Sequence, residues 1–183
     1  MIDLAITADH IRSTIHGYLD EHPDEKPDLA TILGLLDAGA DLASRKEFRG
    51  HATAGAILAR PDGRILHIHH LALDNWLLPG GHLEAQDDTL LEAALRELTE
   101  ETGIPAVAVT AMADRPVDID IHPIPANDAK GEPAHQHIDF RFLFRTTADV
   151  QQLQAEEVTD AAWREVESIT GECLRRRVSA ALR

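Results

Sequence analysis

The chain has 183 residues, with 17 Lys and Arg against 32 Asp and Glu, for a formal net charge of −15. An acidic surface repels nucleic-acid backbones, so we expect no nucleic-acid polymer as a partner, and a phosphate-bearing ligand would need cations. A single cysteine excludes an intrachain disulfide, and no apolar stretch approaches the roughly 18 residues of a membrane span. No basic region precedes an apolar run at the N-terminus, so we expect no signal peptide, no membrane partner and a cytoplasmic location.

Residues 1–49 predict a helical extension that carries no chemical motif. Apolar residues recur there at helical spacing in two groups: Ile11, Ile15 and Leu19, then Leu29, Ile32, Leu35 and Leu36. Thr7 can cap the first helix and Asp28 the second, with a break at Pro23 between them. We expect the second apolar face to pack on the rest of the chain or on a second copy, which leaves a homodimer open.

The remainder of the chain, residues 50–183, mixes strands with a few helices. The turn Pro61-Asp62-Gly63 predicts a hairpin, and Phe140, Phe142 and Phe144 alternate along a later strand. Expected strands cover residues 54–60, 64–70, 76–78, 107–112, 117–121, 137–145 and 161–163; expected helices cover 89–102 and 168–182; a loop covers 123–133. This order predicts an α/β or mixed α+β fold.

The predicted helix over residues 89–102 carries the most informative pattern. Glu97, Glu100 and Glu101 are related by three and four residues, so their side chains share one helix face. Three like charges this close repel one another, and hard divalent cations such as Mg²⁺ prefer carboxylate oxygens. The face is therefore either a metal platform for phosphate chemistry or a solvated acidic surface, and the three residues alone favour neither.

Residues flanking this face complete the local prediction. Asp87 or Asp88 can cap the helix at its N-terminus, and Gly103 stands where a left-handed C-terminal cap belongs. Arg96 can hold a carboxylate through a bidentate contact. The opposite face carries an apolar stripe that we expect to be buried, formed by Leu91, Ala94, Leu95 and Leu98.

The whole segment from Gly81 to Ile104 resembles the Nudix box, G-x5-E-x7-R-E-U-x-E-E-x-G-U, where U is apolar. The matching residues are Gly81, Arg96, Glu97, Leu98, Glu100, Glu101, Gly103 and Ile104. The segment is one residue longer than the standard box, and its first acid is an aspartate, which leaves Asp87 and Asp88 as alternatives for that position.

This resemblance implies a Nudix-type α/β/α sandwich with a mixed sheet over residues 50–183, with residues 1–49 outside it. It implies a hydrolase of a phosphoanhydride bond in a nucleoside diphosphate linked to another moiety, or in a similar small diphosphate. Glu97, Glu100 and Glu101 would bind Mg²⁺ or Mn²⁺, with the Gly81 carbonyl as a further ligand and Arg96 in the catalytic set. A late acid, for which we favour Glu157 over Glu156, would bind metal or act as a base.

Seven histidines are expected to gather at the cleft: His67, His69, His70, His82, His122, His135 and His137. We select His82 and His137 as substrate contacts, because His82 adjoins the box and His137 should line the sheet. Asp139 lies on the same strand face as His137 and faces either cleft or solvent, and Trp76 either stacks on a base or packs. Zinc binding by a histidine pair is an alternative, although no cysteine accompanies the pairs.

Two rival functions are compatible with a Nudix-like fold. A non-catalytic nucleotide-binding or sensing module would not need every metal ligand, and the complete acid set argues against it. The second rival is isomerisation of an isoprenyl diphosphate, an activity known on a related fold that uses a cysteine and a glutamate for proton transfer. Cys173 lies far along the chain from the box, which argues against this activity.

Overall fold

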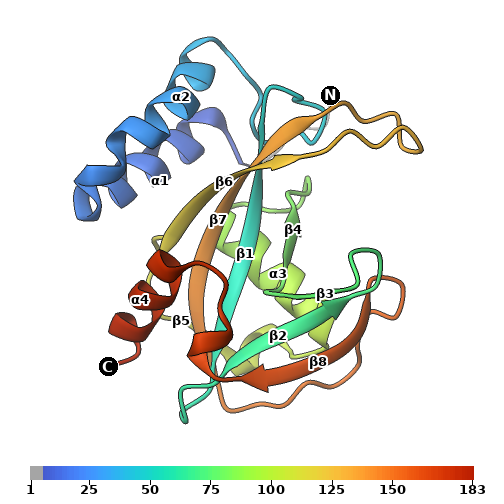
Figure 1. The fold of residues 1–183 in the computed structure, drawn as a ribbon. Coiled ribbons are helices and arrows are strands. Elements are labelled where there is room, and N and C mark those ends of the chain that lie inside the picture. The colour runs from blue at the N-terminus through green and yellow to red at the C-terminus, as the bar shows by residue number, and fades with distance from the viewer. Residues whose placement is uncertain (1–5) are drawn as a thin grey trace.

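The computed structural model describes residues 6–183 and is shown in Figure 1. Its helices are α1 (Ala8–Glu21), α2 (Lys26–Asp37), α3 (Leu90–Thr102) and α4 (Glu172–Ala181). Its strands are β1 (His51–Ala59), β2 (Ile65–His70), β3 (Asn75–Leu77), β4 (Gly80–His82), β5 (Val109–Ala111), β6 (Asp118–Ile124), β7 (His135–Thr146) and β8 (Val158–Arg164). None of the helices in this part of the chain is both long and apolar enough to cross a bilayer.

A parallel pair of strands forms the centre of the sheet. β1 runs beside β7 in register from His51 opposite His137 to Ala59 opposite Arg145. All other pairings are antiparallel: β4 and β2 flank β1, β6 and β5 flank β7, and β2 also pairs with β3 and β8. The predicted mixed sheet is therefore confirmed, and the predicted hairpin closes on the turn at Gly63.

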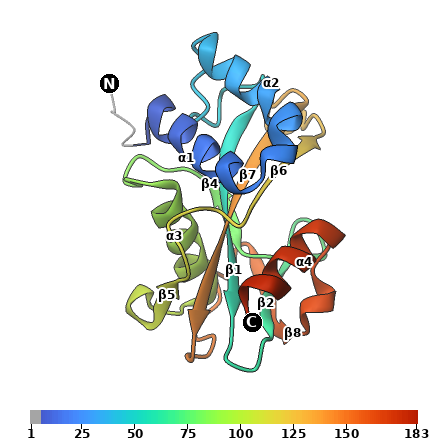
Figure 2. The ribbon, with the colours of Figure 1, turned by 90° about the vertical axis from the view of Figure 1, so that its left-hand side faces the viewer.

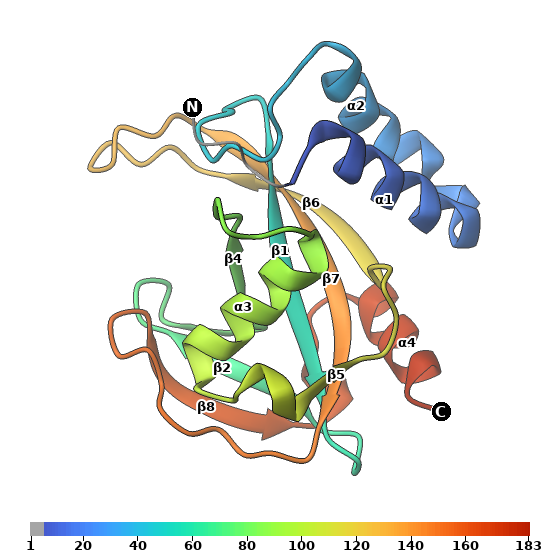
Figure 3. The same ribbon diagram turned by 180° about the vertical axis from the view of Figure 1, so that it is seen from behind.

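Helices cover both faces of this sheet, which confirms the predicted sandwich (Figures 2 and 3). Alternation along β1 directs Ala52, Ala54, Ala56 and Leu58 into the core that includes α3. The intervening Ile57 and Ala59 join Leu174 and Val178 of α4 in a second core. The small alanine side chains along β1 take little space on the α3 face, so α3 can lie close to the strand.

The N-terminal helices pack on the same chain. Thr7 caps α1 as predicted, because its hydroxyl oxygen accepts a hydrogen bond from the His10 N–H at 3.1 Å. Leu29, Ile32 and Leu36 of α2 are buried in the core that also contains α3 residues. Figures 1 and 3 show the pair beside β6. The apolar face of α2 is thus covered within one chain; Met1 to Ala5 of the expected extension lie outside the described residues.

Several elements differ from the sequence prediction, and β1, β7 and β8 each begin two or three residues earlier than expected. α2 begins at Lys26 without a side-chain cap, so the cap predicted at Asp28 is wrong, and Pro27 fixes the first turn instead. The strand expected over 107–112 is shortened, because residues 106–108 form a 3-10 turn after Pro105. The helix expected from 168 starts four residues later, after a 3-10 turn at 166–168. Residues 80–82 form an additional short strand that pairs with β1.

Candidate active site

The loop before α3 is ordered by Asp87, which is 3% exposed. Its carboxylate accepts a hydrogen bond from the Glu84 N–H at 2.7 Å. The helix is capped one step later by Thr89, whose hydroxyl oxygen accepts from the Glu92 N–H at 3.1 Å. The cap predicted at Asp87 or Asp88 is therefore wrong, because the inserted residue moves the helix start and frees Asp87 for the loop. The C-terminal cap at Gly103, with φ of 68°, is confirmed.

Arg96 is the centre of the ion pairs in this loop. Its guanidinium donates to both Asp87 oxygens, at 2.9 and 3.0 Å, and to the His82 carbonyl at 2.9 Å. It also donates to Glu97 and Glu100, each at 3.1 Å. The bidentate contact makes Asp87, and not the exposed Asp88, the partner of Arg96. Arg96 thus fixes the loop to the acidic face of the helix.

Glu97 and Glu101 are carboxylates that are held away from water. Glu101 is 2% exposed, and one of its oxygens accepts from the Gly80 N–H at 3.1 Å. Burial raises the pKa of Glu101 to about 8, and repulsion from Glu97 adds to the shift. Burial likewise raises the pKa of Glu97 to about 7, although Arg96 opposes it. Without a further cation, the site therefore favours protonated carboxyl groups at both positions.

Gly81 lets the loop reach this face. A Cβ at position 81 would lie 2.5 Å from a Glu97 carboxylate oxygen, so any side chain there would have to displace that carboxylate. The glycine therefore allows the backbone of β4 to approach the Glu97 carboxylate directly. This contact joins two predicted members of the site, Gly81 and Glu97.

Glu157 stands in the turn that leads into β8. Its carbonyl accepts from the Leu71 N–H at 2.7 Å, and its side chain is exposed. The Glu157 charge is one of the smaller causes of the raised pKa of both Glu97 and Glu101. The structure therefore brings Glu157 near the helix face although 56 residues separate it from Glu101 in the sequence.

The donor set fits a hard divalent cation. Three carboxylates on one helix turn, a fourth nearby and a close backbone loop supply oxygen atoms, which are the ligands that Mg²⁺ and Mn²⁺ prefer. Arg96 is the only cation that contacts these acids among residues 6–183, and it already serves Asp87. Burial is the main cause of the raised pKa values of Glu97 and Glu101, and repulsion between neighbouring carboxylates adds to it, so a bound cation would favour their ionised forms.

His82 and His137 lie on the opposite face of the sheet from Glu97. Successive strand residues point to opposite faces, and Gly81 points toward Glu97, so His82 points away. The His82 and His137 rings have centroids 5.2 Å apart. Burial lowers the pKa of His82 to about 4 and that of His137 to about 3, with repulsion from neighbouring histidines adding to the latter. Both imidazoles are therefore neutral near pH 7.

The histidine group differs in membership from the prediction. His122 and His135 join His137, with ring centroids 5.6 and 5.3 Å from it. His67 is instead buried against the Ile65 carbonyl on β2. His69 bonds to Thr159, and His70 lies on the same strand, so the expectation that all seven would gather is wrong for these three.

His51 belongs to the group and was missed from the sequence. Its ring centroid is 4.8 Å from that of His137 and 4.9 Å from that of His135. It sits opposite His137 because β1 and β7 are parallel neighbours. More than 80 residues separate the two positions, so no local spacing signals the pair, and only knowledge of this strand register could have found it.

Asp139 extends this face along β7. One carboxylate oxygen accepts from the Thr53 hydroxyl at 3.1 Å, and the other accepts from Arg141 at 2.8 Å. Arg141 also donates to Asp118 and Asp120 at 3.2 and 3.0 Å. Burial raises the pKa of Asp118 to about 6 despite these contacts. Asp139 thus shares its sheet face with His137 and is held in place by a polar network.

Trp76 lies on β3, apart from this histidine group. The Arg164 guanidinium stands 4.0 Å from its ring centroid, and the His69 ring meets it edge-on at 5.2 Å. Its side chain is partly exposed. Cys173 is exposed on α4, the helix that covers the other core. These two residues are therefore not assembled with the carboxylates by any contact that the described residues show.

Comparisons with known proteins identify the family of this chain. The family model described as NUDIX domain matches residues 49–182 of this chain. A protein of Lactococcus lactis subsp. cremoris named "Probable DHNTP pyrophosphohydrolase" is 36% identical over 121 residues, which are 63% of this chain and 66% of that protein. "Phosphatase NudJ" of Escherichia coli K12 is 44% identical over 61 residues, 32% of this chain and 39% of that protein.

Solved structures share the fold. The C. elegans Ap4A hydrolase binary complex superposes with a TM-score of 0.53 at 23% identity, over 72% of this chain and 96% of that one. A NUDIX-family hydrolase from Clostridium perfringens gives 0.52 at 20% identity, over 72% and 95%. The matched part of this chain spans less than two thirds of the length of either of these two relatives. With the family model covering most of the chain, the fold and the box together place this protein in the Nudix family.

Proposed function

We propose that this chain is a Mg²⁺- or Mn²⁺-dependent hydrolase of a phosphoanhydride bond in a nucleoside diphosphate linked to another moiety, or in a similar small diphosphate. The observation that carries the proposal is the pair Glu97 and Glu101, two carboxylates that lie against the Gly80-Gly81 backbone and repel each other when ionised. A divalent cation at this site would reduce the electrostatic repulsion between the acidic protein and an anionic substrate such as a diphosphate.

In this proposal, Glu97, Glu100 and Glu101 hold the cation, and the Gly81 carbonyl adds a ligand. When bound, the ion polarises the diphosphate and lowers the pKa of the attacking water. Arg96 keeps the loop and the carboxylates in one arrangement through Asp87 and the His82 carbonyl. Glu157 accepts the proton from water or serves as a further ligand, since its charge already acts on Glu97 and Glu101.

The sheet face with His82, His137 and Asp139 is the proposed substrate surface. Neutral imidazoles donate and accept hydrogen bonds without adding charge, which suits the polar edge of a base or a sugar. Asp139 is held by Thr53 and Arg141 and offers its remaining lone pairs. Trp76 is the proposed stacking residue, with Arg164 on one side of its ring.

The relative named a probable DHNTP pyrophosphohydrolase supports a nucleotide-like triphosphate as one candidate substrate. The test is a phosphate-release screen with Mg²⁺ over damaged nucleotides, nucleotide sugars, dinucleotides, pterin triphosphates and non-nucleotide diphosphates. We expect turnover on at least one class and its loss in excess chelator. Turnover that persists in chelator would overturn the metal role. Binding without turnover would favour the nucleotide-sensing module.

A further inference from the structure

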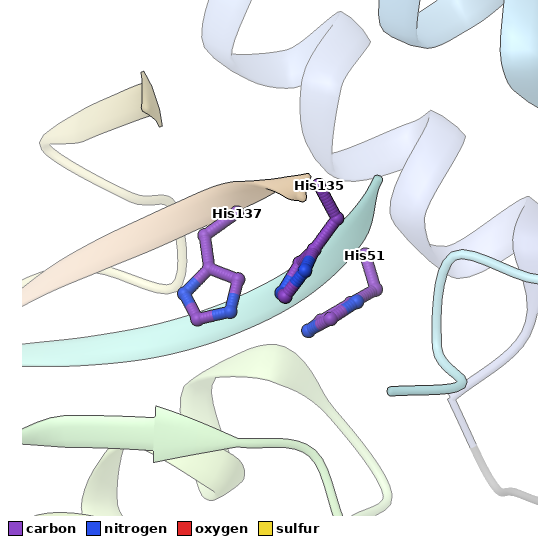
Figure 4. A group of neighbouring side chains, drawn as sticks. All are labelled: His51, His135 and His137. Atoms are coloured by element: carbon purple, nitrogen blue, oxygen red, sulfur yellow. The ribbon is translucent and has the colours of Figure 1, made fainter. Parts of the chain in front are cut away.

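A second set of ligand atoms lies on the histidine face, where no carboxylate of the Nudix box takes part. His51 begins β1, and His135 and His137 begin β7 beside it (Figure 4). One ring nitrogen from each of the three lies within 4.8 Å of the other two. His51 and His135 are 1% and 8% exposed, so two of the three imidazoles are buried.

Backbone carbonyls fix which nitrogen is free. The Nδ1 atom of His135 lies 2.8 Å from the Pro133 carbonyl, and that of His51 lies 3.3 Å from the Glu47 carbonyl. A carbonyl can only accept, so each Nδ1 carries the proton and each Nε2 keeps its lone pair. In metal sites, a hydrogen bond of this kind from one ring nitrogen orients the histidine so that its other nitrogen can bind the metal.

The free nitrogen of His51 has no other use in the fold. Across residues 6–183, its buried Nε2 atom finds no hydrogen-bond partner. A buried acceptor without a partner destabilises the fold. A bound cation would satisfy this atom, and burial lowers the pKa of His51, which keeps the imidazole in the neutral, ligating form.

From this geometry we propose that His51, His135 and His137 form a binding site for a divalent cation of the zinc class, separate from the Mg²⁺ site of the Nudix box. Neutral imidazole nitrogens select Zn²⁺, Co²⁺, Ni²⁺ or Cu²⁺ and bind Mg²⁺ poorly. Zn–N bonds of about 2.0–2.1 Å put tetrahedral nitrogens about 3.3 Å apart, so atoms now within 4.8 Å need to approach by at most about 1.5 Å.

Three protein ligands leave one position of a tetrahedral ion open. His137 is the partly exposed member and lies beside His82, so the open position faces the proposed substrate surface. An imidazole has two ring nitrogens, so His137 can bind the ion through one and donate to substrate through the other. Of the charged side chains nearby, Arg45 opposes a cation and Glu132 favours it, and the two pair at 3.4 Å.

The test measures ion binding by the untagged full-length chain, so it does not depend on the proposed hydrolase activity. Zn²⁺ is titrated by calorimetry in excess Mg²⁺, which occupies the carboxylate face, and Co²⁺ is followed by its visible absorption. We expect one Zn²⁺ per chain that Mg²⁺ does not displace, and intense Co²⁺ bands typical of tetrahedral coordination.

Variants assign the ligands. His135→Gln and His137→Asn should each weaken Zn²⁺ binding by more than about tenfold, a loss seen even for outer partners of metal ligands. His137→Asn alters a partly exposed side chain and keeps the test decisive if His135→Gln fails to fold. His16→Gln, on the exposed face of α1, and Glu97→Gln should leave it unchanged. Zn²⁺ binding that Mg²⁺ displaces, or that Glu97→Gln weakens and the histidine variants do not, would overturn the proposal.

Discussion

The two clusters of titratable groups lie on opposite sides of one sheet and respond to burial in opposite directions. On α3, burial raises the pKa of Glu97 and Glu101 to about 7 and about 8. On the other face, burial lowers the pKa of His82 and His137 to about 4 and about 3. Removal from water disfavours the charged form in both cases, so both clusters tend to neutrality.

The two clusters differ in the kind of partner that would stabilise them. Carboxylates become stable when ionised only if positive charge is supplied, and Arg96 supplies part of it. Imidazoles are already neutral and lack only a partner for a lone pair, as at His51. One sheet thus separates the proposed site for a hard cation from the proposed site for a softer cation, and the two faces meet at the adjacent residues Gly81 and His82.

The largest effect on stability should come from removing Arg96, whose guanidinium is the positive charge that pairs with the carboxylate cluster. Arg96→Ala leaves Asp87 buried without its ion-pair partner, so we expect a loss of about 3–5 kcal/mol in unfolding free energy. Urea denaturation measures it. Arg12→Ala, which breaks the more exposed pair with Asp37, should cost less than about 1 kcal/mol. Equal losses in the two variants would remove Arg96 from the centre of the loop.

Next in size is the effect of carboxylate charge on turnover. Glu97→Gln keeps the side-chain size but removes one proposed metal ligand, and we expect kcat to fall about a hundred- to a thousandfold, or about 3 to 4 kcal/mol. Glu100→Gln should act in the same direction. Glu92→Gln, exposed on the same helix, is the matched control and should leave kcat unchanged. A wild-type kcat in Glu97→Gln would favour the alternative in which the acidic helix face is only a solvated surface.

The third prediction concerns pH and metal together. Because the folded pKa values of Glu97 and Glu101 lie above the usual 4.5, their stabilising contribution is complete below that value and is lost as pH rises through about 7 to 8. Mg²⁺ should therefore raise Tm more at about pH 8.5 than at about pH 5, by a few degrees. Thermal melts with Mg²⁺ or chelator measure this, and a pH-independent Mg²⁺ effect would contradict the assignment.

The smallest effect that we expect is a pH dependence of stability with the opposite sign, caused by His137 on the histidine face. The folded pKa of His137 lies below 6.5, so its stabilising contribution is present above that value and is lost as pH falls toward about 3. His137→Asn should flatten the fall in stability on the acid side, whereas His16→Asn should not. Asp118, with its pKa raised to about 6, acts oppositely in this window, so the informative quantity is the difference between variants.

Local periodicity explains which parts of this molecule were predictable. Glu97, Glu100 and Glu101 share a helix face by spacing alone, and Gly103 follows from helix-end chemistry. The alternating phenylalanines of β7 were likewise predicted from the sequence and are buried. Each of these features depends on residues within a few positions of one another.

Features set by long-range pairing or by loop geometry were not predictable in this way. The choice between Asp87 and Asp88 depended on how an inserted residue was accommodated, and Arg96 decides it in the fold. His51 required the parallel register of β1 and β7. The division into 1–49 and 50–183 stays a prediction, as do the roles assigned to the site residues: Gly81, Arg96, Glu97, Glu100, Glu101, Glu157, His82, His137, Asp139 and Trp76.

The position of α1 and α2 beside β6 has a consequence for handling the protein. β6 pairs with β7 on one side, and the two helices lie next to it, with Arg115 donating to the Gly17 carbonyl at 3.3 Å. A chain trimmed to the family boundary at residue 49 would lack both helices and would expose part of the apolar core that they share with Ile119. Exposed apolar surface promotes association, so such a fragment should self-associate, and its precipitation would report on the lost cover rather than on catalysis.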